Sequence, residues 1–161
     1  MTSPKPAAGA PLPELTFAKL GGGALHVGGP RDRWTLLVVY RGKHCGRCKK
    51  YLGTLEGMKS AWEDAGFAIV AVSADPEAKA LHDRDGQGWS FDIGYDMDAA
   101  QMAALGVYVS APLSSGETDR NFAEPAGYCL RPDGSVQIAA ISNGPAARPD
   151  LAELLDGMVF T

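Results

Sequence analysis

Residues 34–50 read WTLLVVYRGKHCGRCKK, and this stretch decides the fold. Residues 34–40 are apolar or β-prone, which is typical of a central strand buried on both faces. The segment that follows has apolar residues three and four positions apart, which predicts a helix over residues 46–65. These apolar positions are Tyr51, Leu55, Met58 and Trp62. A strand therefore ends, a short loop carries Cys45 and Cys48, and a helix begins.

The position of the two cysteines favours thiol chemistry. The first turn of a helix offers unpaired N–H groups and a partial positive charge, and both stabilise a thiolate over a thiol. Cys45 lies at or just before this turn, so it is the predicted nucleophile. Cys48, one turn later, is placed to resolve a mixed disulfide on Cys45. Nearby cations act in the same direction. They are Lys43, Arg47, Lys49 and Lys50.

Length and composition indicate one ordinary globular domain. The chain has 161 residues, of which 45% are apolar and 21% charged, with a formal net charge of -4. We expect a flexible arm over residues 1–13 and a single domain over residues 14–161. The charge balance argues against a nucleic-acid partner, and no apolar run reaches the roughly 18 residues of a membrane span. Residues 1–13 lack the apolar region of a secretory signal, so the expected location is the cytoplasm.

Cysteine spacing separates redox chemistry from metal binding. In a reducing compartment a C-x-x-C pair is more often catalytic or metal-binding than structural. A zinc site normally needs four ligands. The chain has no second C-x-x-C, and its histidines, His26, His44 and His82, show no ligand spacing. The sequence therefore favours redox use of Cys45 and Cys48, with no metal and no organic cofactor.

The third cysteine, Cys129, falls on a predicted strand. We interpret it as a core residue. The alternative is a third thiol close to the pair, because residues 125, 127 and 129 share one face of a strand.

The order of predicted elements gives an α/β fold. Alternating strand–helix units, followed by a hairpin and a last helix, predict a central mixed β-sheet flanked by helices on both faces. The strands are expected over residues 15–20, 24–27, 34–40, 67–72, 91–95, 107–109, 127–130 and 135–141. After the helix over residues 46–65, further helices are expected from Pro76 to about Asp85, from Asp96 or Asp98 to Gly106, and from Pro149 onward. Residues 110–124 are expected to form a long polar loop.

Four stretches together resemble a known family. They are residues 34–52, residues 69–75 (IVAVSAD), Glu124-Pro125 followed by Pro132-Asp133-Gly134, and residues 145–149. The chain resembles the thioredoxin-like fold, and more closely the peroxiredoxin-like proteins of the AhpC/TSA family (alkyl hydroperoxide reductase and thiol-specific antioxidant). The resemblance implies an antioxidant oxidoreductase of cell redox homeostasis that acts on a disulfide-containing or hydroperoxide substrate. An external thiol reductant would regenerate it, and a homodimer is one assembly that it allows. It also implies a cis-proline facing the cysteines, at Pro125.

Departures from the family pattern define the open questions. Peroxiredoxins carry a proline seven residues and a threonine three residues before the peroxide-attacking cysteine, where this chain has Val38 and Gly42. The peroxiredoxin arginine near the start of the hairpin strand is also missing. Arg41 and Arg148 are the candidates to replace it. The buried aspartate of thioredoxins is replaced by Val39.

Three hypotheses follow from this mixture. The first is a thiol–disulfide oxidoreductase in which Cys45 attacks and Cys48 resolves. The second is a peroxiredoxin-like thiol peroxidase that reduces hydroperoxides through Cys45. The third is a non-catalytic redox-sensing or binding module. Residues expected to tune the thiol or bind substrate are His44, Arg47, Arg41, Pro125 and Arg148. For His44 the alternatives are a cationic ring that stabilises the thiolate and a side chain that only fills its position.

Overall fold

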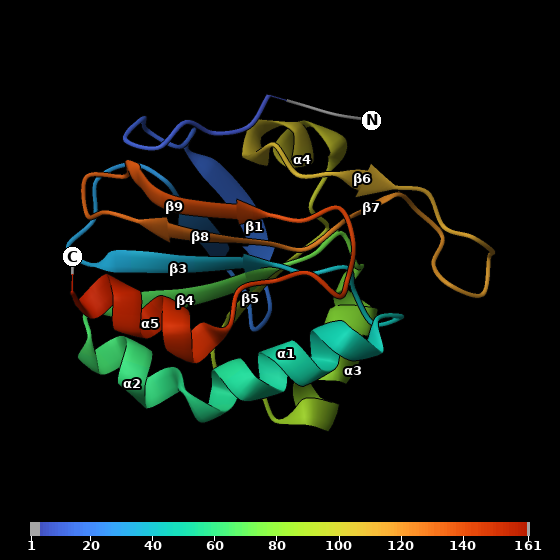
Figure 1. Cartoon of the computed structure of the whole chain (residues 1–161). Coiled ribbons are helices and arrows are strands. Elements are labelled where there is room, and N and C mark those ends of the chain that lie inside the picture. The colour runs from blue at the N-terminus through green and yellow to red at the C-terminus, as the bar shows by residue number, and fades with distance from the viewer. Residues whose placement is uncertain (1–3, 161) are drawn as a thin grey trace.

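A seven-stranded mixed sheet forms the centre of the molecule (Figure 1). The computed structural model describes residues 4–160 and orders the strands β2-β1-β5-β4-β3-β8-β9. β3 (Trp34–Val39), β4 (Phe67–Val72) and β5 (Asp92–Tyr95) run parallel. The strands on either side of them pair antiparallel and are β1 (Leu15–Lys19), β2 (Ala24–Val27), β8 (Ala126–Leu130) and β9 (Val136–Ile141). The predicted mixed sheet is confirmed.

Helices cover both faces of this sheet, as predicted (Figure 1). Four lie on one face: α1 (Gly46–Gly57), α2 (Lys59–Asp64), α3 (Glu77–Gln87) and α5 (Leu151–Val159). α4 (Ala99–Leu105) lies on the other. Alternate residues of β3 point to opposite faces, so Leu36 and Val38 pack in one apolar cluster and Leu37 and Val39 in the other. Cys45 and Cys48 belong to the first cluster.

The helix after the cysteines is interrupted. It was expected to run unbroken over residues 46–65, but α1 ends at Gly57 and α2 starts at Lys59, with Met58 between them at φ -104° and ψ 4°. Gly57 has the poorest helix propensity among non-proline residues, which favours a break here. The apolar spacing continues across the break, so periodicity alone does not detect it. The predicted stop at Gly66 is confirmed, since it has φ +96°.

Two further helix ends show how glycine acts as a stop. α3 was expected to stop before Gly86, but it continues to Gln87 and is capped by Gly88 in the left-handed region. The Gly88 N–H donates a hydrogen bond to the Arg84 carbonyl at 2.9 Å. This bond satisfies one of the last carbonyls of α3, so Gly88 and not Gly86 ends the helix. α4 is capped by Asp98, one of the two predicted cap residues, and ends at Leu105 with Gly106 as the predicted stop.

A short ribbon divides the segment that was expected to be loop over residues 110–124. β6 (Val109–Ser110) pairs with β7 (Phe122–Ala123), and the ribbon projects from the end of the sheet (Figure 1). Strands of two residues have no periodicity to read, which is why the sequence did not show them. The ribbon matters because β7 and the residues after it lie beside the cysteine loop.

Part of the N-terminal segment packs on the hairpin. Gly9 N–H donates to the Val136 carbonyl at 2.7 Å, and Leu12, 2% exposed, donates to the Gly134 carbonyl at 3.1 Å. These contacts differ from the expectation of a flexible arm for this stretch, because Leu12 supplies apolar area to the core. Residues 1–3 lie outside the described residues, and the domain division stays a prediction. Within residues 4–160, every helix is too short or too polar to cross a membrane.

Candidate active site

The thiol of Cys45 caps the first turn of α1. Cys45 has extended backbone, φ -108° and ψ 101°, and its Sγ accepts a hydrogen bond from the Cys48 N–H at 3.2 Å. The cap position is one that favours a negative side chain, because the first N–H groups of a helix have no intrahelical acceptor. The predicted place of Cys45 at the helix start is thus observed. Its side chain is only 3% exposed.

A buried carboxylate holds the loop before Cys45. Asp75 follows β4, is 2% exposed, and accepts from the Lys43 N–H at 2.8 Å. Burial raises the pKa of this carboxyl, and the Lys43 hydrogen bond opposes the rise. Gly42 has φ +129°, and a Cβ placed there would lie 2.6 Å from an Asp75 oxygen. Only glycine fits this approach. The family's threonine position is therefore occupied by a residue that lets Asp75 fix the loop.

Arg41 brings a cation to the Cys45 sulfur. Its guanidinium is one of the groups that lower the pKa of Cys45, and its Nε lies 3.0 Å from an oxygen of Glu124. Glu124 is 3% exposed, and its other oxygen accepts from the Ser110 hydroxyl at 2.7 Å. The guanidinium also lies 4.9 Å from the ring centroid of Phe122. β6, β7 and the residue after β7 thus fix the direction in which Arg41 points.

These contacts make Cys45 an acid of unusual strength for a thiol. The hydrogen bond from the Cys48 thiol is the largest cause, and the Cys48 N–H and Arg41 add to it, while burial opposes them. Together they lower the pKa of Cys45 to about 5. At neutral pH the Cys45 side chain is a thiolate, the form that reacts as a nucleophile.

Cys48 experiences the opposite shift. The pKa of Cys48 is raised because its thiol donates a hydrogen bond to Cys45 and because Cys48 is 0% exposed. Two donors act against this rise. The Arg148 Nη2 lies 3.4 Å and the Arg41 N–H 3.5 Å from the Cys48 Sγ. The pair therefore holds one proton on Cys48 and one negative charge on Cys45.

Arg148, which lies a hundred residues beyond Cys48 in the chain, is fixed by α1. Its guanidinium carbon lies 4.9 Å from the ring centroid of Tyr51. The Tyr51 hydroxyl donates to the Pro149 carbonyl at 2.7 Å and thereby ties the segment before α5 to α1. The two arginines that the sequence proposed as replacements thus lie at different sulfurs: Arg41 faces Cys45, and Arg148 faces Cys48.

His44 and Arg47 are the two other candidates close to the cysteines in the chain. The pKa of His44 is lowered by burial and by Arg41, which disfavours the cationic ring that was one of its two alternatives. It packs edge-on against Phe122 at 4.5 Å between ring centroids, which supports the space-filling alternative. Arg47 is exposed on α1, and the side-chain cations that reach the two sulfurs are Arg41 and Arg148.

Pro125 differs from its expected conformation. Residues 4–160 contain no cis peptide bond, so the bond before Pro125 is trans. Trans is the favoured form of an X–Pro bond by roughly 0.5–1 kcal/mol. Hydrogen bonds on both sides are made in this form: Glu124 N–H donates to the Tyr108 carbonyl at 2.8 Å, and Ser142 N–H to the Pro125 carbonyl at 3.0 Å. The cis-proline implied by the resemblance is thus wrong for this structure.

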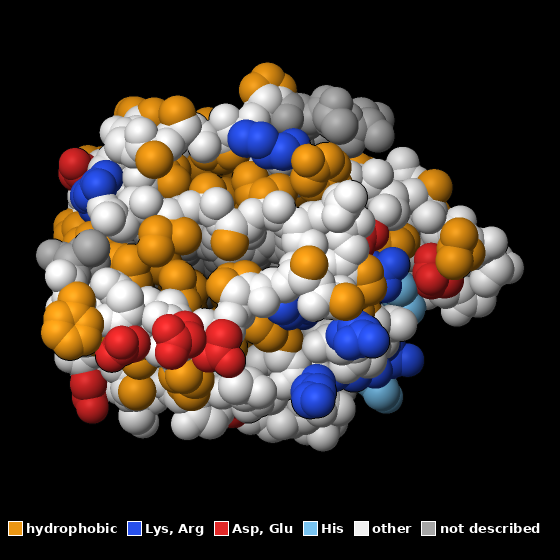
Figure 2. All heavy atoms as spheres, in the orientation of Figure 1, with side chains coloured by type: hydrophobic (Ala, Val, Ile, Leu, Met, Phe, Trp, Pro, Cys, Tyr) orange, Lys and Arg blue, Asp and Glu red, His pale blue; other side chains and the backbone are white. Residues whose placement is uncertain are grey.

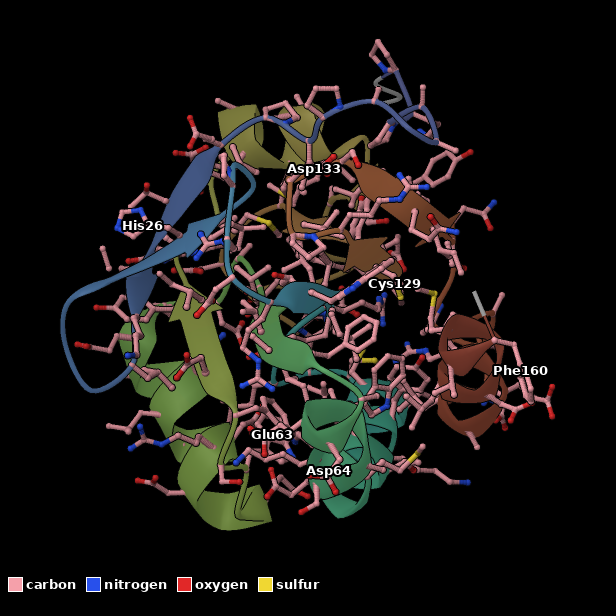
Figure 3. The ribbon with its side chains drawn as sticks, turned by 90° about the vertical axis from the view of Figure 1, so that its left-hand side faces the viewer. His26, Glu63, Asp64, Cys129, Asp133 and Phe160 are labelled. Carbon is pink, nitrogen blue, oxygen red and sulfur yellow. The ribbon has the colours of Figure 1, made fainter. Side chains whose placement is uncertain are left out.

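Cys129 is a core residue, as interpreted. It is 0% exposed on β8, and burial raises its pKa to about 12, so it is a neutral thiol. Figure 3 shows it in the interior between the sheet and α5, whereas His26 lies at the outer edge of the sheet. Among residues 4–160, no cluster of three or more His, Cys, Asp or Glu side chains is arranged to hold a metal ion.

Glu124, Phe122, Asp75 and Tyr51 are parts of the site that sequence reasoning did not assign to it. A motif at Glu124-Pro125 and the IVAVSAD stretch contain two of them. Their proximity to the thiols depends on how β4 and β7 are placed around the loop after β3, and no local pattern encodes that.

A family model described as the AhpC/TSA family matches residues 8–139. The chain belongs to the AhpC/TSA family. Membership confirms the resemblance and the prediction of an oxidoreductase with thiol-dependent redox activity. No curated protein sequence matches this member.

Solved structures share its fold at low identity. A peroxiredoxin-like protein from Aquifex aeolicus has a TM-score of 0.77 and 16% identity, over 97% of this chain and 88% of that one. AhpC of Mycobacterium bovis has a TM-score of 0.76 and 16% identity, over 96% and 92%. The mitochondrial 2-Cys peroxiredoxin of Plasmodium falciparum has a TM-score of 0.74 and 13% identity, over 94% and 92%. The thioredoxin-like fold is thus confirmed.

Proposed function

We propose that this AhpC/TSA protein is a thiol peroxidase in which Cys45 attacks a hydroperoxide and Cys48 forms the disulfide. One observation carries the proposal: Cys45 is 3% exposed, and its pKa is lowered to about 5 with the Arg41 guanidinium among the causes. A thiol with so little exposed surface is more accessible to a small oxidant than to a protein disulfide. This low exposure therefore places the peroxidase hypothesis ahead of the thiol–disulfide oxidoreductase hypothesis.

The first step needs a thiolate and a cation at one place. The Cys45 thiolate attacks the nearer oxygen of the hydroperoxide, the O–O bond breaks, and the leaving oxygen takes a proton to become water or an alcohol. Negative charge develops on the leaving oxygen, and a guanidinium held beside the sulfur stabilises it. Arg41 supplies this group from the position four residues before Cys45. Its ion pair with Glu124 at 3.0 Å limits its freedom to turn away.

The second step uses the change in charge on Cys45. While Cys45 is a thiolate, it accepts a hydrogen bond from the Cys48 thiol and so raises the pKa of Cys48. Oxidation to a sulfenic acid removes that negative charge. The Arg148 and Arg41 donors at the Cys48 sulfur then favour its ionised form. Cys48 attacks the Cys45 sulfur, hydroxide leaves and is protonated to water, and a disulfide forms. Cys48 thus becomes a nucleophile only after Cys45 has been oxidised.

The test is the reaction of the fully reduced protein with hydrogen peroxide. Intrinsic fluorescence follows it by stopped flow, because Trp62 and Trp89 belong to the same apolar cluster as both cysteines. We expect a fast phase that Cys45→Ser abolishes, ending in a Cys45–Cys48 disulfide seen by mass spectrometry of peptides. A wild-type rate equal to that of free cysteine would refute the peroxidase.

Thiol–disulfide exchange is the second candidate. The opposite pKa shifts of Cys45 and Cys48, joined by a hydrogen bond, favour it, because exchange also needs one thiolate and one protonated partner. Reduction of a small mixed disulfide, with slow peroxide chemistry, would establish it. If the protein is a redox-sensing module, we expect catalytic turnover with neither peroxides nor disulfides. The cytoplasmic location and homodimer stay predictions.

A further inference from the structure

A cavity of about 490 Å³ lies on the Cys48 side of the site. Its floor is formed where β3, β8 and β9 meet, at Val38, Gly127 and Ala140, which are register partners across the three strands. Tyr51 and the segment before α5 close one side. Figure 2 shows that this face is hollowed between the sheet and α5 and that apolar side chains surround the hollow. The volume is in the range of small-molecule sites.

Small side chains create this space. Gly127 lies on the cavity floor, and a Cβ built there meets nothing within 4 Å. Ala126, Ala140 and Ala147 also line the cavity. A strand glycine with open space over it marks a place where another molecule can approach the backbone closely.

Arg148 is the charged residue among those lining the cavity. Its Nη2 contacts the Cys48 sulfur, so the same guanidinium joins the cavity to the thiol pair. Its Nε is buried and has no hydrogen-bond acceptor among the described residues. Buried charged donors are normally satisfied, so an acceptor that is absent from the protein itself is expected here. A cavity that apolar residues line together with Ser142 and Asn143, and that has one guanidinium at its wall, fits a molecule with an apolar chain and a carboxylate.

We propose that this cavity binds the reducing cosubstrate, a low-molecular-weight thiol that carries a carboxylate and an apolar chain. The inference rests on the peroxidase cycle proposed above, which ends in a disulfide that an external thiol must reduce. The carboxylate binds Arg148 and draws the guanidinium away from Cys48, which is otherwise fully buried.

Electrons and atoms balance over two thiols. The thiolate of the first attacks the Cys48 sulfur, the Cys45–Cys48 bond breaks, and Cys45 leaves as a thiolate. Cys45 is the better leaving group of the two, because its pKa is about 5. A second thiolate attacks the ligand sulfur of the mixed disulfide on Cys48. The ligand disulfide departs, Cys48 takes up a proton, and the reduced pair is restored.

The experiment uses the full chain oxidised with diamide, so that the disulfide is made without peroxide. Its reduction is followed with 6-mercaptohexanoate and with 6-mercaptohexanol, which differ in the carboxylate. We expect the acid to react about tenfold or more faster, as one charge-assisted hydrogen bond allows, and its rate to saturate. Hexanoate, which has no thiol, should compete with it.

Two variants and their matched controls locate the effect. Arg148→Gln should remove the preference for the acid, whereas Lys50→Gln, which removes an exposed cation from α1, should keep it. Gly127→Leu fills the cavity and should abolish saturation with the acid. Gly53→Leu adds the same side chain on the outside of α1, where a Cβ also meets nothing within 4 Å. In this control the rate with the acid should still saturate.

Equal rates for the two thiols in the wild type would overturn the proposal, as would failure of diamide to form the disulfide. A preference that survives both Arg148→Gln and Gly127→Leu would also overturn it. This experiment uses no peroxide. A protein that does not react with hydrogen peroxide can therefore still show the preference for the acid thiol, so failure of the proposed peroxidase activity is distinguishable from failure of the proposed thiol site.

Discussion

Cys45 and Cys48 lie on the same helix start, yet their surroundings push their pKa values in opposite directions. The Cys48 thiol and the Cys48 N–H donate hydrogen bonds to Cys45, Arg41 adds positive charge, and the pKa of Cys45 falls to about 5. Cys48 is fully buried, keeps its proton and donates a hydrogen bond to Cys45, and its pKa rises. Each sulfur has its own arginine, one next to the loop and one from the far end of the chain. Position on the helix therefore sets which sulfur is acidic, and tertiary contacts set how far apart the two become.

The largest effects on the reaction with hydrogen peroxide are expected from replacing each of the two cysteines by serine. Cys45→Ser should lose the reaction with hydrogen peroxide completely, because a serine hydroxyl is not ionised at neutral pH. Cys48→Ser should keep the first step and accumulate sulfenic acid on Cys45, since no resolving thiol remains. Trapping with dimedone, followed by mass spectrometry, measures both. Loss of the first step in Cys48→Ser with a native circular dichroism spectrum would show that the roles are not divided in this way.

Removing the cation beside Cys45 should bring the two pKa values closer together. Arg41→Gln should raise the pKa of Cys45 by about 1 unit or more, because an opposite charge in contact normally shifts an acid by that amount. The rate of iodoacetamide alkylation against pH gives this pKa. Arg47→Gln removes an exposed cation from the first turn of α1 and should change the pKa of Cys45 little. Equal shifts in both variants would mean that general charge, rather than the Arg41 contact, acidifies Cys45.

The acidity of Cys45 should also appear in the pH dependence of stability. Its folded pKa of about 5 lies below the ordinary value of 9.0. The stabilisation from its thiolate is therefore complete above about pH 9 and is lost as the pH falls through about 5. The unfolding free energy of the reduced wild type, minus that of Cys45→Ser, should rise with pH between these limits by up to about 1.4 kcal/mol per pH unit. Urea denaturation between pH 5 and 8 measures it, and a flat difference would contradict the shifted pKa.

The smallest effect is expected at the third thiol. Cys129 is buried and neutral, so Cys129→Ala should leave the peroxide rate and the Cys45–Cys48 disulfide within about twofold of wild type. The variant should lose about 1–2 kcal/mol of unfolding free energy through the space left in the core. Peroxide kinetics and urea denaturation separate the two readouts. A mixed disulfide to Cys129 in the oxidised wild type would instead make it part of the cycle.

The sequence by itself determined the parts of this protein that depend on neighbours in the chain. The buried β3, Cys45 at the start of α1, the Gly106 C-cap of α4 and the alternation of the long strands with helices follow from periodicity and capping. The position of Cys45 indicated which thiol would be acidic, because helix N–H groups are local. These are interactions among residues a few positions apart, and their patterns can be read directly.

Only the tertiary structure decided what surrounds the two sulfurs. Glu124, which follows the β6–β7 ribbon, orients Arg41 through their ion pair. Arg148 reaches Cys48 because Tyr51 of α1 ties the segment before α5 to α1. The neutral state of His44 and the trans bond at Pro125 were likewise beyond local patterns. Burial, ion pairing and hydrogen bonding between distant segments depend on how the sheet brings the ends of β3, β4 and β8 together. A residue's charge and reactivity are set by these contacts, which one stretch of sequence does not contain.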